Sequence, residues 1–218
     1  MKVKAIIFDL DGTLLNTLED LAASTNYALK TNGFAERSID EVRSFVGNGL
    51  GLLAHRALPQ GKENPLYEKV LADLRSHYAE HSLVKTKPYD GIIKMLDFLK
   101  AKNITTAIVS NKPDAQVKSL AEIFFSKYMD NECCIGECAG VKRKPAPDTV
   151  LKVMKHLNLK KEECIYVGDS EVDIETAKNA GLKCISVSWG FKGREFLIEH
   201  KADTIIDKPE ELLQLLEF

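Results

Sequence analysis

The chain has 218 residues, of which 44% are hydrophobic and 28% charged, so it is long enough for one sizeable core, or for a core with a smaller satellite domain. The formal net charge of −2 lacks the strongly basic balance of nucleic-acid-binding proteins, which argues against a nucleic-acid partner. No apolar run approaches the ~20 residues that a membrane span needs, and no signal-peptide pattern precedes the first apolar segment, so we expect a cytoplasmic protein without a membrane partner.

The first predicted element is a buried strand at residues 5–8, formed by an alanine, two isoleucines and a phenylalanine. Asp9 and Asp11 follow it, two positions apart, where their like charges repel and cost stability unless a cation compensates. Gly12 then permits a sharp turn and a close approach of the backbone to a ligand. The two aspartates therefore indicate a cation-binding site at the end of this strand.

The next part of the chain shows only helical patterns. Amphipathic segments occur at residues 18–29, 39–46, 50–57 and 66–78. Ser38 and Glu41 have the spacing of a capping box, which predicts where the second of these helices begins. Because no strand pattern interrupts this block, we predict an all-helical domain inserted into a core, with the helical domain at residues 17–83 and the core at residues 1–16 and 84–218.

From residue 88 onward, short apolar runs alternate with amphipathic segments. Strands are predicted at residues 104–109, 129–135, 164–167, 184–187 and 204–206, and helices at residues 92–100, 115–124, 148–157, 173–180 and 210–216. This alternation predicts an α/β fold, a doubly wound and mostly parallel sheet of the Rossmann-like type with helices on both faces. Ligands of such sheets bind at the carboxyl ends of the strands, so functional residues are expected just after each strand.

Polar side chains follow several of these predicted strands. Ser110 and Asn111 come after the strand at residues 104–109, and Asp169 lies just beyond the strand at residues 164–167. Asp173 lies one helical turn beyond Asp169, and Lys144 stands between them and Asn111 in a loop with two prolines. Each residue alone has an ordinary explanation as a helix cap or a surface lysine.

Together these residues indicate a particular kind of site more specifically than any one of them does alone. Carboxylate oxygens suit Mg²⁺, whereas a hydroxyl, an amide and a lysine suit the oxygens of a phosphoryl group. The sequence therefore predicts a site for Mg²⁺ and a phosphoryl group at one edge of the sheet.

Four motifs in order resemble those of the haloacid dehalogenase superfamily of hydrolases, in its phosphoglycolate phosphatase-like branch with a helical cap. They are DLDGTL at residues 9–14, Ser110 with Asn111, Lys144 in KPAPD, and GDSEVD at residues 168–173. This resemblance spans the whole chain and implies an enzyme, a Mg²⁺-dependent phosphatase. It would hydrolyse a small soluble phosphomonoester similar to 2-phosphoglycolate through an aspartyl-phosphate intermediate.

The resemblance also assigns roles to the residues. Asp9 would be the nucleophile, and Asp11 would protonate the leaving oxygen and later deprotonate water. Asp9, Asp169 and the backbone carbonyl of Asp11 would bind Mg²⁺, with Asp173 supporting them from behind. Substrate binding is expected of three further residues, Ser110, Asn111 and Lys144; the family pattern alone selects Lys144 over its basic neighbours.

Other functions remain open at this stage. The sequence LLNT, with Asn16, also resembles pyrophosphatase-type relatives, so an inorganic pyrophosphatase is an alternative. A β-phosphoglucomutase-like phosphomutase is a further alternative, although this chain has Leu21 and Leu50 where those mutases carry a histidine and an arginine. A non-catalytic phospho-acceptor or regulatory domain fits less well, because that hypothesis predicts the loss of a motif residue or of the helical insertion.

Three residues of the helical domain are candidates for substrate selection, namely Asn48, His55 and Arg56. Asn48 lies in a glycine-rich turn, and the other two follow it on the next predicted helix. The five cysteines lack a paired spacing and a nearby histidine, which favours reduced thiols over a metal site. The sequence does not fix the oligomeric state or the phosphate ester.

Overall fold

The computed structural model describes residues 3–216. Its chain divides into two compact units, the first formed by the residues up to Leu14 and from Pro88 onward, and the second by Leu15–Lys87. The sequence pattern placed these boundaries at residues 16/17 and 83/84. The connecting segments also contain two short strands, β2 (Leu15–Asn16) and β3 (Lys87–Pro88), which pair with each other and which the sequence pattern did not indicate.

The first unit contains a six-stranded sheet in the order β5-β4-β1-β6-β7-β8, in which neighbouring strands are parallel. The strands are β1 (Ala5–Phe8), β4 (Thr105–Pro113), β5 (Cys134–Glu137), β6 (Cys164–Gly168), β7 (Lys183–Val187) and β8 (Ile205–Ile206). The chain runs from the central strand β1 outward in both directions, so the predicted doubly wound, mostly parallel sheet is confirmed.

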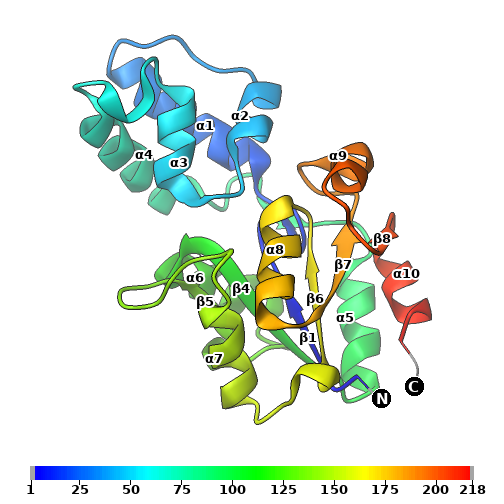
Figure 1. The fold of residues 1–218 in the computed structure, drawn as a ribbon. Helices are drawn as coiled ribbons and strands as arrows, with labels where there is room; N and C mark the ends of the chain where they lie inside the picture. The colour runs from blue at the N-terminus through cyan, green and yellow to red at the C-terminus, as the bar shows by residue number, and fades with distance from the viewer. Residues whose placement is uncertain (1–2, 217–218) are drawn as a thin grey trace. The chain divides into compact units, whose positions relative to one another are not determined.

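Helices follow the strands as predicted, with one addition. They are α5 (Ile92–Ala101), α6 (Asp114–Phe125), α7 (Asp148–His156), α8 (Glu171–Ala180), α9 (Gly193–Glu199) and α10 (Pro209–Gln214). In Figure 1, α7 and α8 lie on one face of the sheet, and α5 lies on the other, where it packs against α10. The sequence pattern missed α9 because this helix has seven residues, begins at a glycine and buries only Leu197.

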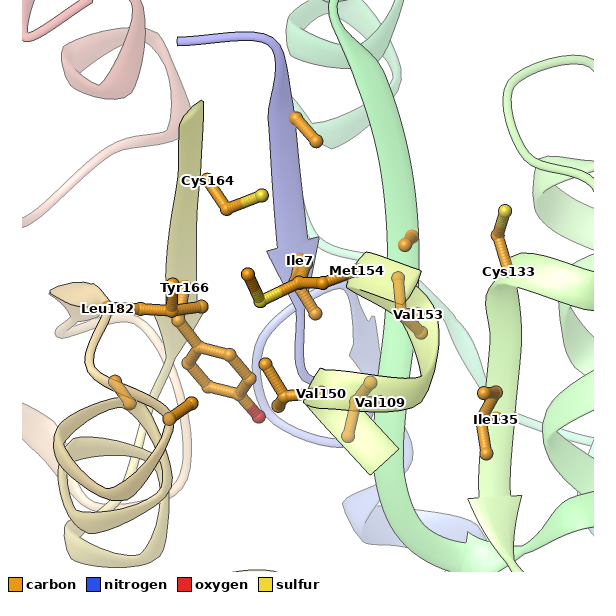
Figure 2. Close-up of a cluster of buried hydrophobic side chains, with 14 residues drawn as sticks. Ile7, Val109, Cys133, Ile135, Val150, Val153, Met154, Cys164, Tyr166 and Leu182 are labelled. Carbon is orange, nitrogen blue, oxygen red and sulfur yellow. The ribbon is translucent and has the colours of Figure 1, made fainter. Parts of the chain in front are cut away.

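Alternation along the strands decides which residues face α7 and α8. Figure 2 shows this core, where Ile7 of β1, Val109 of β4 and Tyr166 of β6 meet Val150 and other side chains of α7. Successive side chains of a strand point to opposite faces of the sheet. Asp9, two residues after Ile7, is therefore expected on the same face as Ile7, at the carboxyl end of β1. The same core therefore positions the first residue of the predicted site.

Apart from the short strands at its two ends, the second unit consists of helices. They are α1 (Leu18–Thr31), α2 (Ile39–Phe45), α3 (Gly49–Ala57), a 3₁₀ turn (Gly61–Glu63) and α4 (Tyr67–His81). The capping box predicted for α2 is confirmed, because the Glu41 N–H donates to Ser38 Oγ at 3.2 Å and the Ser38 N–H donates to Glu41 Oε2 at 2.7 Å. The longest helices, α1 and α4, pack against each other and bury apolar side chains such as Leu29 and Leu74.

A buried carboxylate fixes the end of this helical unit. Asp20 of α1 accepts hydrogen bonds from the backbone N–H groups of Lys85, at 2.9 and 3.0 Å, and of Thr86, at 2.9 Å. It thereby satisfies two amides that would otherwise lack a partner where the chain leaves the unit.

The five cysteines are free thiols. Cys133 and Cys164 belong to the apolar core shown in Figure 2, which accounts for them as packing residues. Among the described residues, none of the helices has both the length and the apolar character needed to cross a membrane.

Candidate active site

Three carboxylates meet where β1 and β6 end. Asp9 directly follows β1, Asp169 directly follows β6, and Asp173 lies in the first turn of α8. Each offers an oxygen atom within 4.8 Å of those of the other two, and all three residues are buried. The sequence assigned Asp173 a supporting place behind the site, whereas the structure brings its carboxylate into the group itself.

Lys144 is the cation that contacts this group. Its Nζ lies 2.9 Å from Asp9 Oδ1 and 2.7 Å from Asp173 Oδ1, and its side chain is only 2% exposed. The neighbouring Lys142 and Arg143 are exposed, so the structure separates the three basic residues by burial. Burial alone would lower the pKa of Lys144, but the carboxylates of Asp173 and Asp9 outweigh it and raise the pKa above its usual range.

Sequence reasoning missed Tyr166, which extends this network. Its Oη accepts from Lys144 Nζ at 3.1 Å and donates to Asp173 Oδ1 at 3.0 Å. The sequence analysis did not select Tyr166 because this residue lies in the middle of an apolar strand and packs in the core. A tyrosine at such a position was nevertheless a usable signal, since a buried hydroxyl needs a hydrogen-bonding partner.

The cluster holds more negative charge than Lys144 neutralises. Burial raises the pKa of Asp9 to about 7, even though the Lys144 ammonium opposes this shift and Asp173 adds to it. Burial, together with Asp173 and Asp9, also raises the pKa of Asp169 well above its usual range. Three buried carboxylates with one ammonium form a hard, all-oxygen donor set that a divalent cation would relieve, so the residues present fit a metal ion.

Asp11 contacts a second buried lysine. Both of its carboxylate oxygens accept hydrogen bonds from Lys112 Nζ, at 2.8 and 2.9 Å. The sequence suggested that the carboxylates of Asp9 and Asp11 face a common cation. In the structure the two carboxylates contact different lysines, since Asp9 is paired with Lys144 and Asp11 with Lys112.

Ser110 and Asn111 lie inside the last residues of β4 rather than after the strand, since β4 extends to Pro113. Ser110 Oγ is buried and accepts the backbone N–H of Lys112 at 3.2 Å. Asn111 Nδ2 donates to the backbone carbonyl of Lys144 at 3.2 Å, so this amide holds the loop that carries the lysine. Its Oδ1 is buried without a hydrogen-bond partner among the described residues.

The segment after β7 was also missed by the sequence analysis. The backbone N–H of Phe191 donates to Asp169 Oδ2 at 2.7 Å, and Trp189 Nε1 donates to the carbonyl of Thr13 at 3.0 Å. These bonds fix one carboxylate of the cluster and the turn after β1. The rule that ligands gather at strand ends would have found this segment, because it follows the predicted strand at residues 184–187.

Gly12 has a backbone conformation that few other residues adopt, with φ at +86°. A Cβ atom at this position would lie 2.5 Å from Asp169 Oδ2. The glycine therefore allows the turn after β1 to approach the carboxylate cluster.

Replacing Gly12 with alanine should strain the backbone and, in addition, displace a carboxylate of the cluster. Gly33 provides a matched control, because its φ is +79° and a Cβ atom added there would have no other atom within 4 Å. Both substitutions should cost about 1–2 kcal/mol of stability for the left-handed backbone, measured by urea unfolding. Gly12→Ala should in addition reduce turnover about 100-fold by displacing Asp169, and equal turnover of the two variants would contradict this role.

The three candidates in the helical unit have contacts of their own. His55 Nδ1 accepts the backbone N–H of Lys62 at 2.9 Å, and Arg56 Nη1 donates to the carbonyl of Phe45 at 2.7 Å. Asn48 precedes α3 and is half-buried. The named polar atoms of His55 and Arg56 thus bind backbone groups of the 3₁₀ turn and of α2 in their own unit.

The comparisons with known proteins agree with this geometry. Residues 6–187 match the family model described as haloacid dehalogenase-like hydrolase. The phosphoglycolate phosphatase of Aquifex aeolicus is 33% identical over 216 residues, which cover 99% of this chain and 97% of that protein. The phosphoglycolate phosphatase 1 of Pseudomonas aeruginosa is 32% identical over 96% of this chain and 78% of its own length.

Solved structures give the same result for the fold. A crystal structure from Lactobacillus delbrueckii subsp. bulgaricus matches with a TM-score of 0.94 and 34% identity, covering 100% of both chains. A predicted phosphoglycolate phosphatase from Haemophilus somnus matches with a TM-score of 0.88 and 27% identity, covering 99% of this chain and 98% of that one.

The parallel sheet, the motif residues at its carboxyl edge and these matches define a class of enzyme. The chain belongs to the family of haloacid dehalogenase-like hydrolases. Within that family it is similar to the phosphoglycolate phosphatase branch, whose members are phosphoric monoester hydrolases.

Proposed function

We propose that this chain is a Mg²⁺-dependent phosphatase that hydrolyses a small phosphomonoester similar to 2-phosphoglycolate through an aspartyl-phosphate on Asp9. The observation that carries the proposal is the buried cluster of three carboxylates with Lys144 at the carboxyl edge of the sheet. The phosphoglycolate phosphatases among its relatives support the choice of substrate.

The proposed reaction has two steps. A carboxylate oxygen of Asp9 attacks phosphorus, the bond from phosphorus to the ester oxygen breaks, and Asp11 donates a proton to the departing alcohol. Water then attacks the phosphoryl group on Asp9, and Asp11 accepts a proton from this water. The bond between phosphorus and the Asp9 oxygen breaks, so the Asp9 carboxylate is regenerated and inorganic phosphate leaves. One difficult displacement is thereby divided into two easier ones.

Lys144 and Ser110 are proposed to hold the phosphoryl oxygens. The ammonium of Lys144 already contacts Asp9, so it orients the nucleophile and lies where negative charge develops during the transfer. Ser110 Oγ lies at the carboxyl end of β4, the strand next to β1. Asn111 acts indirectly in this proposal, through its hydrogen bond to the Lys144 carbonyl.

Asp9, Asp169 and the backbone carbonyl of Asp11 are the proposed ligands of Mg²⁺, with Asp173 beside them. When bound, the ion would neutralise charge on the cluster and on the phosphoryl group. The mainly helical unit, Leu15–Lys87, is proposed as the substrate-selecting domain. Asn48 is its first candidate, since His55 and Arg56 support backbone groups of that unit.

A substrate panel tests the proposal. It should contain 2-phosphoglycolate, pyrophosphate, nucleoside monophosphates and β-glucose 1-phosphate, and the highest kcat/KM is expected for 2-phosphoglycolate. A preference for pyrophosphate, or conversion of β-glucose 1-phosphate to glucose 6-phosphate, would instead favour the pyrophosphatase or the phosphomutase alternative.

Mg²⁺ should stabilise the protein, and more strongly as the pH rises from 6 to 8. Burial raises the pKa of Asp9 to about 7, so at pH 6 the ion must displace a proton, and its affinity should be lower there than at pH 7 by a factor of about ten or more. At a concentration of 100 times Kd the expected gain is about 2.7 kcal/mol, seen as a higher unfolding temperature. EDTA should remove both this gain and the activity. Full activity in EDTA, or a stabilisation independent of pH, would contradict the metal assignment.

A further inference from the structure

Two histidines of the helical unit stack on each other, and the roles proposed above use neither of them. His77 and His81 are four residues apart in α4, with ring centroids 3.9 Å apart and ring planes 9° from parallel. Tyr27 of α1 also stacks on His77, with 4.1 Å between the centroids. Residues at this spacing lie on the same side of a helix, so the two imidazoles form one feature of the surface. His81 is exposed and His77 is half-buried.

One nitrogen of each histidine is already held. His81 Nδ1 lies 2.9 Å from the carbonyl oxygen of His77, and since a carbonyl can only accept, this nitrogen carries the proton. His77 Nδ1 lies 2.9 Å from Ser24 Oγ, a hydroxyl of α1 that can accept a proton from it. Histidines that bind metal ions almost always donate their other ring N–H to an acceptor of the protein. Both rings therefore have the partners that turn the lone pair of Nε2 into a metal ligand.

The Nε2 atoms are free to take a ligand. Among the residues that the structure describes, neither of them takes part in a hydrogen bond. Burial lowers the pKa of His77, and the neighbouring His81 adds to this effect while Glu80 opposes it. The neutral imidazole that a metal ion requires is therefore favoured near pH 7.

The spacing of the two rings suits one ion. Zn–N bonds measure about 2.0–2.1 Å, so two nitrogens of a tetrahedral site lie about 3.4 Å apart. The ring separation of 3.9 Å is close to this value, so small rotations of the side chains bring both nitrogens to one ion. Imidazole suits Zn²⁺, Ni²⁺ and Cu²⁺, whereas Mg²⁺ prefers oxygen ligands. The histidine pair thus differs in its chemistry from the carboxylate cluster of the first unit.

We propose that His77 and His81 form a second metal site, which binds a divalent transition-metal ion such as Zn²⁺ through their Nε2 atoms. Two imidazoles leave the remaining positions to water, so the ion exchanges with solvent. It adds positive charge near the last turn of α4, where the helix dipole favours a cation. Through Ser24 it also fixes the end of α4 to α1. The site stabilises the helical unit and is independent of the proposed phosphatase reaction.

Calorimetric titration with Zn²⁺ tests the pair. His77→Gln and His81→Gln should each weaken the same Zn²⁺ site about 100-fold, because a single imidazole lacks the high effective concentration of the second one. Ser24→Ala should weaken it about tenfold, because the ring of His77 loses the acceptor that orients it. The carboxylate cluster is present in every variant, so any Zn²⁺ that binds there is common to all of them.

His200→Gln is the matched control for these variants. His200 Nδ1 lies 2.8 Å from the carbonyl oxygen of the residue four positions earlier, and its ring stacks at 3.9 Å on that residue, which is Phe196. The local geometry is the same, but the second imidazole is replaced by a phenyl ring. This control should bind Zn²⁺ as the unmodified protein does. Equal affinity in all variants, or a loss in only one of the two α4 variants, would overturn the proposal.

A measurement on the unmodified protein avoids the problem of a variant that fails to fold. With ¹⁵N-labelled histidine, Zn²⁺ should shift the Nε2 resonances of His77 and His81 together and leave that of His200 in place. Zn²⁺ should also raise the unfolding temperature of the unmodified protein more than that of His81→Gln. A shift at one of the two α4 rings alone, or at neither, would refute the site.

Discussion

Replacing Asp9 with asparagine should abolish hydrolysis of every substrate, with a fall in kcat on the order of 10⁴-fold or more. An amide is a poor nucleophile, so no phosphoryl group should become attached to the protein. Incubation with labelled substrate, acid quenching and mass spectrometry of the intact chain measure this directly. A labelled Asp9→Asn variant would mean that another residue is the nucleophile.

The same substitution should make the metal-free protein more stable at pH 8. Burial raises the pKa of Asp9 from 3.8 to about 7 on folding, so between these values the folded state binds more protons than the unfolded state. Stability therefore falls as the pH rises from about 4 to 7, and the full penalty is present above 7. An uncharged asparagine avoids this penalty, although Lys144 then keeps only Asp173 as a carboxylate partner.

Thermal unfolding in EDTA checks this expectation across the pH range. The advantage of Asp9→Asn over the unmodified protein should be largest at pH 7–8 and should narrow toward pH 4. Asp97→Asn is a suitable control, because Asp97 forms an exposed ion pair with Lys127 outside the site. A variant that is both inactive and less stable at pH 8 would indicate that Asp9 is a structural residue rather than a catalytic one.

Replacing Lys144 with methionine should have the second-largest effect, on both stability and activity. The substitution leaves the buried carboxylates of Asp9 and Asp173 without their cation, which typically costs about 3–5 kcal/mol. Loss of a preorganised cation at the phosphoryl group should also lower kcat/KM about 10³-fold. Mg²⁺ should recover part of the stability, because it supplies positive charge to the same carboxylates.

Lys142→Met is the matched control for this experiment. Lys142 stands two residues earlier in the same loop and is exposed, so its loss should change stability and kcat/KM little. Lys144→Arg keeps the charge and should retain part of the stability. If Lys144→Met unfolded at the same urea concentration as Lys142→Met, the buried ion pairs would not be contributing as the structure indicates.

The sequence determined where the site lies, because the periodic patterns of strands and helices are sufficient to place it. The alternation of strands and helices predicts a parallel sheet, and a parallel sheet brings all its carboxyl ends to one edge. Asp9 directly follows one predicted strand and Asp169 lies two residues beyond another, so their proximity follows from topology without knowledge of any contact. The capping box at Ser38 was predictable for a similar reason, since it depends only on local backbone geometry.

Only the tertiary structure decided which charged groups meet. Lys142, Arg143 and Lys144 are neighbouring basic residues that the sequence alone does not distinguish. Lys144 is the buried one because its loop packs on β6 and α8. The contact between Lys112 and Asp11 joins residues 101 positions apart, and that between Lys144 and Tyr166 joins residues 22 positions apart, so local sequence patterns do not specify these pairs. The pKa of Asp9 likewise follows from desolvation by the whole fold. Sequence periodicity specifies which face a residue occupies, whereas ion pairs and desolvation depend on the three-dimensional packing of many residues.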